Sequence, residues 1–159
     1  MALPGHVAAA FLSGILSKQL QVQPAGVDLT VSEVHEFLEH GFLGAEKKKL
    51  PATKKLDPTE GKWFLKKGAY KILFNEVVRV PEDCIAIGLP RSSLLRCGAD
   101  VRSALWDPGY VGRSECLLVV HNPYGLELEE NARVLQLIFI KLVEKPIVTY
   151  RGSYQFENI

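Results

Sequence analysis

The chain has 159 residues, 47% of them hydrophobic, a length that supports one hydrophobic core and favours a single domain over residues 1–159. Its 19 Lys and Arg residues nearly balance its 18 Asp and Glu residues. This balance excludes the broad positive field with which proteins collect nucleic acid or anionic membranes. We therefore expect neither as a partner, and any recognition of phosphate must be local.

The three cysteines, Cys84, Cys97 and Cys116, are odd in number, far apart and without a CxxC pair. This pattern argues against a disulfide framework and against a zinc site, and it favours a reducing, cytoplasmic location. The apolar stretch over residues 6–16 has no basic region before it and is far shorter than the roughly 20 residues that span a bilayer. We predict neither a signal peptide nor a membrane anchor there.

The first 20 residues (1–20) are expected to form a helical segment. Val7, Phe11 and Ile15 recur at every fourth position, which places one apolar stripe on a short helix. This stripe should pack against the rest of the domain. Residues 27–31 then alternate apolar and polar side chains, and this period of two predicts a strand.

The lysine-rich residues 46–58 are expected to form a solvated connection. The residues Asn-Pro-Tyr-Gly at 122–125 are a strong turn signal between two strands. Short β-branched or aromatic runs separated by Gly, Pro, Asn and Asp cover residues 63–65, 69–74, 77–80, 84–89, 101–106, 116–120 and 133–143. Their spacing indicates a β-sandwich or barrel rather than strands alternating with helices.

Residues 90–98 follow a β run and read as one short helix, because Ser92 and Ser93 suit a helix N-cap and a glycine ends the segment. The start of this helix would offer backbone N–H groups and hydroxyls. Arg91 and Arg96 add guanidinium groups, and together these donors suit a polyphosphate. The residues alone leave open a second interpretation, a capped helix with two surface arginines.

A second cluster, residues 106–113, places a carboxylate and an aromatic ring around a Pro-Gly turn. Such a turn would hold Asp107 beside a water molecule and lay Tyr110 against a sugar or a base. The alternative is a hairpin turn whose Asp side chain bonds only its own backbone.

Five segments, taken in order, resemble the dUTPase and dCTP deaminase superfamily, and within it the archaeal dUTPase branch. Four of them look like the family's first to fourth motifs, and the fifth is similar to the tail of deaminase-like members; they are residues 23–29, 90–96, 106–112, 132–136 and 150–155. The resemblance implies a mainly β fold, the distorted β-barrel called a β-clip, with a short N-terminal helix and one short helix at the second motif. It also implies a homotrimer with active sites at subunit interfaces.

The same resemblance implies a role for individual residues in a site for dUTP and Mg²⁺. Asp107 would be the catalytic base. Asp28 would orient magnesium-bound water or form part of the sugar pocket, while the triphosphate itself holds most of the cation and no side chain binds it directly. The phosphates would be bound by Arg91, Ser92, Ser93 and Arg96.

The sugar, the base and the closing tail account for the other implied binding residues. Tyr110 would pack on the deoxyribose, and the backbone around residues 104–107 would read the pyrimidine. Gln136 and the tail, residues 146–159, would close over the triphosphate. This second group of residues is Ala104, Leu105, Trp106, Tyr110, Arg133, Gln136, Tyr150, Tyr154 and Gln155.

The superfamily contains two chemistries, hydrolysis of dUTP at the α-phosphorus and deamination of dCTP. Deamination as the family performs it needs a further glutamate about ten residues beyond the third-motif aspartate. Direct counting reaches Leu117, and an insertion of two residues shifts the position to Val119; both are apolar. We therefore favour hydrolysis of dUTP to dUMP and pyrophosphate by water that Asp107 activates, with Mg²⁺ present.

Two alternatives stay open. Glu115 shares a strand face with residues 117 and 119, so a deaminase or a bifunctional enzyme is the first. A protein that binds the nucleotide without turning it over is the second. Asp107 speaks against the second, because a carboxylate near the phosphates would repel them.

Overall fold

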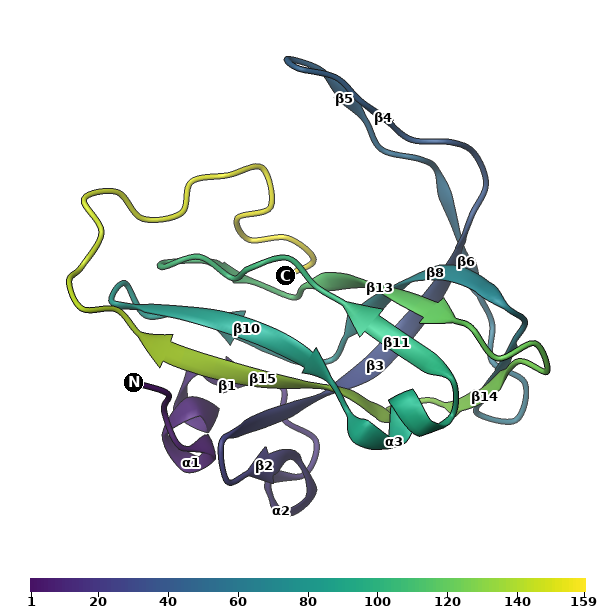
Figure 1. Ribbon diagram of the computed structural model, residues 1–159, viewed down its shortest axis with the longest axis horizontal. Coiled ribbons are helices and arrows are strands. Elements are labelled where there is room, and N and C mark those ends of the chain that lie inside the picture. The colour runs from purple at the N-terminus through teal and green to yellow at the C-terminus, as the bar shows by residue number, and fades with distance from the viewer.

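The computed structural model describes residues 1–159 and consists mainly of short strands (Figure 1). The helices are α1 Gly5–Ala8, the 3₁₀ helix η1 Ala9–Phe11, α2 Lys18–Gln21 and α3 Ser92–Arg96. The strands are β1 Leu12–Ser13, β2 Val22–Gln23, β3 Gly26–Phe37, β4 Phe42–Leu43, β5 Lys48–Lys49, β6 Thr53–Leu56, β7 Lys62–Leu65, β8 Gly68–Phe74, β9 Val77–Arg79, β10 Cys84–Pro90, β11 Ala99–Arg102, β12 Val111–Gly112, β13 Glu115–Val120, β14 Leu126–Glu129 and β15 Arg133–Lys141.

An eight-stranded antiparallel sheet forms the body of the molecule. Its strands follow the order β10-β15-β3-β8-β13-β11, and β2 and β6 also pair with β3. The two ends of this path meet just after β11, where Trp106 and Ala86 of β10 exchange backbone hydrogen bonds of 2.9 and 3.0 Å. The sheet is therefore a nearly closed barrel, and the predicted mainly β barrel is confirmed.

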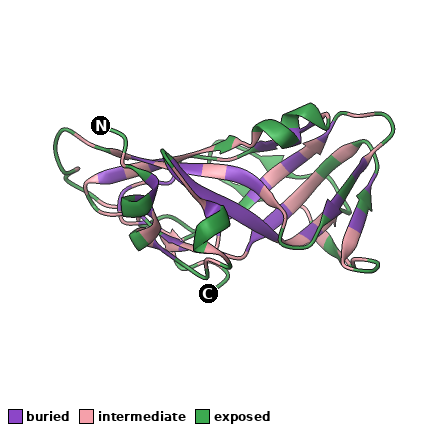
Figure 2. Cartoon of the chain, turned by 90° about the horizontal axis from the view of Figure 1, so that it is seen from below, coloured by how far each residue is buried: buried purple, intermediate pink, exposed green.

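The barrel encloses one contiguous hydrophobic core. Most of the strands contain buried residues (Figure 2). In β13 the expected alternation holds, since Cys116, Leu118 and Val120 are buried and the residues between them are not. It fails in β3, where every residue from Gly26 to Val31 is buried. The N-terminal helices pack beside the start of β3, so both of its faces are covered there.

The predicted N-terminal helix is shorter than expected. The α-helix covers only Gly5–Ala8 and continues as the 3₁₀ helix η1 to Phe11, because the chain leaves helical geometry at Leu12 to pair with Val78 of β9. Gly14 then adopts a positive φ of 80°, which a helix does not tolerate. The expected apolar stripe is also wrong in part, since Val7 is 37% exposed and Ala8 is fully buried.

Three short strands that the sequence did not predict lie in the lysine-rich segment or just before it. β4 and β5 form a hairpin that projects from the barrel, and β6 extends the sheet by pairing with the far half of β3 (Figure 1). Its lysines at 47–49 are exposed, as expected of a solvated connection. β6 forms there because β3 runs for 12 residues and offers a free edge beyond Val34.

The predicted turn between two strands is confirmed. The chain turns at 122–125, where the Gly125 N–H donates to the Asn122 carbonyl at 3.0 Å and joins β13 to β14. All three cysteines are free. None of the helices combines the length and apolar character that crossing a bilayer would take.

Candidate active site

The turn that carries Asp107 is held by backbone hydrogen bonds on both sides. The Tyr110 N–H donates to the Asp107 carbonyl at 3.1 Å, with Pro108 and Gly109 between them. Gly109 has a φ of 84°, which favours glycine at the third position of such a turn. Val80 bonds the turn twice, donating to Tyr110 and accepting from Gly109. The carboxylate therefore projects from a backbone that has little freedom to move.

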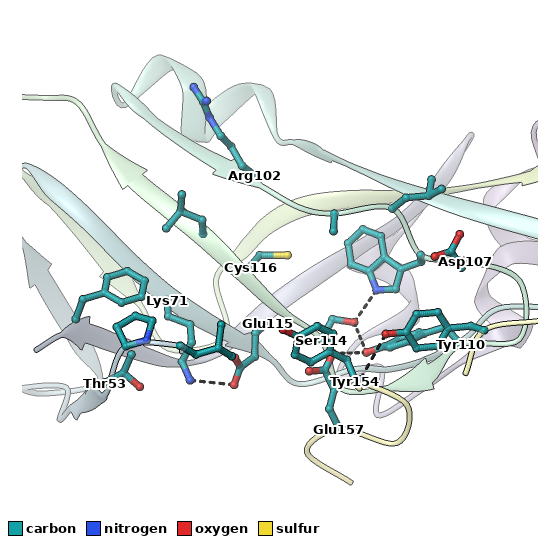
Figure 3. A pocket seen from close by; sticks show the side chains of 18 residues that line it. Thr53, Lys71, Arg102, Asp107, Tyr110, Ser114, Glu115, Cys116, Tyr154 and Glu157 are labelled. Carbon is teal, nitrogen blue, oxygen red and sulfur yellow. Dashed lines mark hydrogen bonds and ion pairs between the residues drawn. The ribbon is translucent and has the colours of Figure 1, made fainter. Parts of the chain in front are cut away.

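Asp107 lines a cavity of about 520 Å³, within the range typical of small-molecule sites (Figure 3). Figure 3 shows no hydrogen bond or ion pair between its carboxylate and the other side chains that line the cavity. The lining residues are Phe37, Leu50, Pro51, Thr53, Lys71, Arg102, Ala104, Leu105, Trp106, Asp107, Tyr110, Ser114, Glu115, Cys116, Leu117, Tyr150, Tyr154 and Glu157.

A chain of hydrogen bonds runs beneath the aromatic wall of this cavity (Figure 3). The Trp106 indole N–H donates to the Ser114 hydroxyl at 2.6 Å, and this hydroxyl lies 2.9 Å from the Tyr110 hydroxyl. Tyr110 in turn donates to the carboxylate of Glu157 at 2.7 Å. Burial raises the pKa of the Tyr110 hydroxyl above its usual value and raises the pKa of Glu157 as well. Tyr110 is therefore a neutral donor.

The C-terminal tail docks on the Asp107 turn of its own chain and on the strand after it. The Tyr150 N–H donates to the Pro108 carbonyl at 2.7 Å, and the Phe156 N–H donates to the Val111 carbonyl at 2.7 Å. The side-chain amide of Gln155 makes two further bonds, accepting from the Val111 N–H at 3.0 Å and donating to the Gly109 carbonyl at 2.9 Å. The tail thus braces the turn along its length.

Asp28 and two arginines form a second cluster of charge. The Asp28 side chain is 1% exposed, and its Oδ2 lies 2.9 Å from Nε of Arg91 and 3.3 Å from Nη1 of Arg133. Burial raises the pKa of Asp28, an effect that the two guanidinium groups oppose. Gln136 lies beside Asp28 in the register of β15 and β3. The observed contacts of Asp28 orient these two guanidinium groups.

The predicted helix at the second motif is present but shorter than residues 90–98. It covers Ser92–Arg96, with Arg91 in extended geometry at the N-cap and no side-chain capping bond. The serines lie in the first turn rather than at the cap, and both are exposed. Arg96 is exposed as well. The hydroxyls and the Arg96 guanidinium face solvent, where an anionic ligand can reach them.

The structure divides the predicted site residues between these regions. The cavity contains Ala104, Leu105, Trp106, Asp107, Tyr110, Tyr150 and Tyr154. It does not contain Asp28, Arg91, Ser92, Ser93, Arg96, Arg133, Gln136 or Gln155. The predicted phosphate-binding residues and the predicted base therefore do not share a cavity within one chain.

Several lining residues were not singled out in the sequence. Ser114 and Glu157 complete the hydrogen-bond chain, and the sequence gives no signal that links them, because they lie 43 positions apart and are joined only through Tyr110. Glu115 does line the cavity and pairs with Lys71 at 3.0 Å. Leu117 lines it too, as do Ser114 and Cys116 beside it.

Burial raises the pKa of the Cys116 thiol to about 12, so this cavity residue is a neutral thiol at physiological pH. No three His, Cys, Asp or Glu side chains converge as a candidate metal-ion site.

Residues 8–142 match the dCTP deaminase-like family. The chain belongs to this family. A probable deoxyuridine 5′-triphosphate nucleotidohydrolase of Methanococcoides burtonii is 40% identical over 151 residues, which cover 93% of this chain and 89% of the relative. A protein of the same name in Aeropyrum pernix is 45% identical over 139 residues, or 87% of each chain.

Solved structures of low sequence identity share the family fold. The 2′-deoxycytidine 5′-triphosphate deaminase of Agrobacterium tumefaciens superposes with a TM-score of 0.66 at 19% identity, over 87% of this chain and 47% of that one. The Staphylococcus bacteriophage 80alpha dUTPase superposes with a TM-score of 0.52 at 12% identity, over 89% of this chain and 95% of that one.

Proposed function

We propose that this chain is a dUTP diphosphatase that hydrolyses dUTP to dUMP and pyrophosphate with Asp107 as the general base. One observation carries the proposal: an unpaired carboxylate on a braced turn lines a cavity with aromatic walls, of a size that suits a nucleotide. Relatives at 40–45% identity over most of their length bear the name of this activity.

The reaction needs one proton acceptor in this cavity. A water molecule attacks the α-phosphorus, its proton passes to the Asp107 carboxylate, and the bond from the α-phosphorus to the oxygen that bridges to the β-phosphate breaks. Pyrophosphate leaves with that oxygen. A positioned base contributes roughly 10²–10⁴-fold to the rate of such a step.

The remaining roles follow the chemistry of each region. Tyr110 and Trp106 provide flat apolar surfaces for the sugar and the base, beside the backbone of Ala104 and Leu105. The exposed Ser92, Ser93 and Arg96 bind phosphate oxygens, as does Arg91, which Asp28 holds in place. Arg133 and Gln136 complete this region, and Tyr150, Tyr154 and Gln155 contribute from the tail.

The reaction uses Mg²⁺. Mg²⁺ keeps most of its coordination on phosphate oxygens and water, so the missing carboxylate cluster does not conflict with it. Among the three carboxylates of the cavity, Asp107 is suited to contact magnesium-bound water, because Glu115 is paired with Lys71 and Glu157 accepts from the Tyr110 hydroxyl. When bound, the cation neutralises charge that builds on the phosphates during the displacement.

The chain acts as a cytoplasmic homotrimer in which each active site takes residues from neighbouring copies. Support comes from the separation of the phosphate-binding residues from the Asp107 cavity within one chain. A closed cyclic assembly repeats one contact around the ring, so the second cluster of one copy can face the cavity of the next at every interface.

Deamination of dCTP is the second candidate function. One observation supports it, because Glu115 and Glu157 both line the cavity and could transfer protons there. Against it, Leu117 lines the cavity where a proton-shuttling glutamate is required. Lys71 also neutralises Glu115.

Separate incubations with dUTP and dCTP, each with Mg²⁺, distinguish these functions by their products. The proposal predicts dUMP and pyrophosphate from dUTP and no change in dCTP. Loss of ammonia from dCTP would instead establish a deaminase or a bifunctional enzyme. Binding of either nucleotide without turnover would establish a non-catalytic protein.

A further inference from the structure

The hydrogen bonds beneath the cavity all run in one direction. Glu157 accepts from the Tyr110 hydroxyl, so the hydroxyl of Ser114 must donate to the oxygen of Tyr110. The Ser114 oxygen remains free to accept from the Trp106 indole N–H. Trp106, Ser114 and Tyr110 then each donate one hydrogen bond to the next group. Hydrogen bonds in such a series strengthen one another, because each bond polarises the next.

The hydrogen-bonded side chains are packed tightly against the surrounding backbone. A Cβ atom at Gly112 would lie 2.5 Å from the Tyr110 hydroxyl, so only glycine leaves room for that hydroxyl to reach Ser114 and Glu157. The Tyr110 ring also meets the edge of the Tyr150 ring at a centroid distance of 5.7 Å. Trp106, Tyr110 and Ser114 are each at most 5% exposed.

The rings of Trp106 and Tyr110, which the hydrogen bonds hold in place, lie next to Asp107, the proposed general base. Trp106 directly precedes Asp107 and Tyr110 ends the same turn, so a movement of either ring displaces the carboxylate. We propose that Ser114 and Glu157 are positioning residues for the reaction at Asp107, with Ser114 fixing both rings and Glu157 making the fixation depend on the docked tail. The inference rests on the proposed dUTP hydrolysis.

This assignment gives the tail a second role. Tail residues bond Pro108, Gly109 and Val111, and Glu157 adds the one link that enters the buried chain. Docking of the tail therefore completes the geometry of the catalytic turn within its own subunit, before any contact with a triphosphate.

The kinetic test compares substitutions that remove or keep each hydrogen-bonding group. Ser114→Ala is expected to lower kcat for dUTP by about 10- to 100-fold with a smaller change in KM, because small displacements of a reacting group cost rate at this scale. Ser114→Thr keeps the hydroxyl and should restore most of the loss. Glu157→Ala should lower kcat less than Ser114→Ala does, and Glu157→Gln, whose amide oxygen still accepts, should lower it least.

A matched control removes a hydroxyl away from the cavity. Ser32 donates to the Leu73 carbonyl at 3.1 Å and does not line the cavity. Ser32→Ala should leave kcat and KM at the wild-type values. An equal loss of kcat in this variant would overturn the specific role of Ser114.

The chain has two tryptophans, which supply a readout independent of activity. The Trp63 indole N–H donates to the Leu56 carbonyl at 2.9 Å and serves as the internal reference. Ser114→Ala should move the indole N–H resonance of Trp106 in a ¹⁵N–¹H spectrum and leave that of Trp63 in place. Glu157→Ala should also move the Trp106 resonance, although Glu157 does not touch Trp106.

The two readouts separate the inference from the proposed function. If the wild-type chain does not turn over dUTP, the proposed function fails, and the spectra still decide whether the hydrogen-bond chain exists. Wild-type kcat in both alanine variants would overturn the positioning role, even with a shifted resonance. If the Trp106 resonance moved in neither alanine variant, the hydrogen-bond chain from Trp106 to Glu157 would be overturned.

Discussion

Two regions of this chain carry carboxylates in opposite settings. Asp28 is buried and paired with two arginines, whereas Asp107 lines an aromatic cavity without a partner. The first setting fixes two guanidinium groups, since a buried carboxylate restrains its partners. The second leaves a carboxylate free to take a proton. This contrast is the reason why the proposed chemical step is assigned to Asp107 and not to Asp28.

The regions also differ in what holds them. The Asp28 cluster is built from β3, β15 and the segment before α3, all within the central sheet or next to it. The Asp107 turn depends on Val80 and on a tail that arrives from the far end of the chain.

Removal of the free carboxylate should have the largest effect. Asp107→Asn is expected to lower kcat for dUTP by about 10²–10⁴-fold with KM little changed, because the amide cannot accept the proton of water. Steady-state kinetics of dUMP formation measure both constants. Turnover at the wild-type rate would exclude Asp107 as the base.

Arg91→Ala should act on binding and on stability. We expect KM for dUTP to rise about 10- to 100-fold, the value of one charged hydrogen bond, and the free energy of unfolding to fall by about 1–3 kcal/mol because buried Asp28 loses a partner. Kinetics and denaturant unfolding at equal chain concentration measure the two effects. Arg79→Ala is the control, since Arg79 is exposed and bonds Ser13. An unchanged KM in Arg91→Ala would remove Arg91 from the phosphate site.

Substitution of a third carboxylate, that of Glu76, should have the smallest effect. Glu76 is fully buried among uncharged partners, including Gln21 and Thr30, and burial raises its pKa above the usual glutamate value. A raised pKa in the folded state stabilises the protein at low pH, and this stabilisation is lost as pH rises through the raised pKa. The unfolding free energy of Glu76→Gln should therefore fall less steeply than wild type over that range. Parallel pH profiles in denaturant titrations would contradict the assignment.

The fold followed from the sequence wherever strands are compact apolar runs. The runs at 84–89 and 116–120 became β10 and β13 within one residue. β14 was missed although it alternates Leu and Glu, because glutamate is rare in strands and only pairing with β7 buries its leucines. The N-terminal stripe suggested a longer helix because the pairing of Leu12 with Val78 is invisible to local periodicity.

The site was predictable where its residues are close in sequence. Trp106, Asp107 and Tyr110 fall within one turn, and its Pro-Gly pair marks the geometry directly. Ser114 and Glu157 could not be found this way, since their link depends on a tail that folds back over the barrel (Figure 1). The separation of the two charged regions also required the fold, because the motif order along the chain suggests one site.

Subunit complementation tests most directly whether the two regions meet only between copies of the chain. Asp107→Asn and Arg91→Ala subunits are each impaired, and they are dissociated together and reassembled at equal amounts. Suppose that each site takes Asp107 from one copy and Arg91 from another. About a quarter of the sites in randomly mixed trimers then contain both native residues. The rate of dUTP hydrolysis should therefore rise well above that of either variant alone. A mixture no more active than the average of the two variants would place both residues in one chain's site and contradict the account.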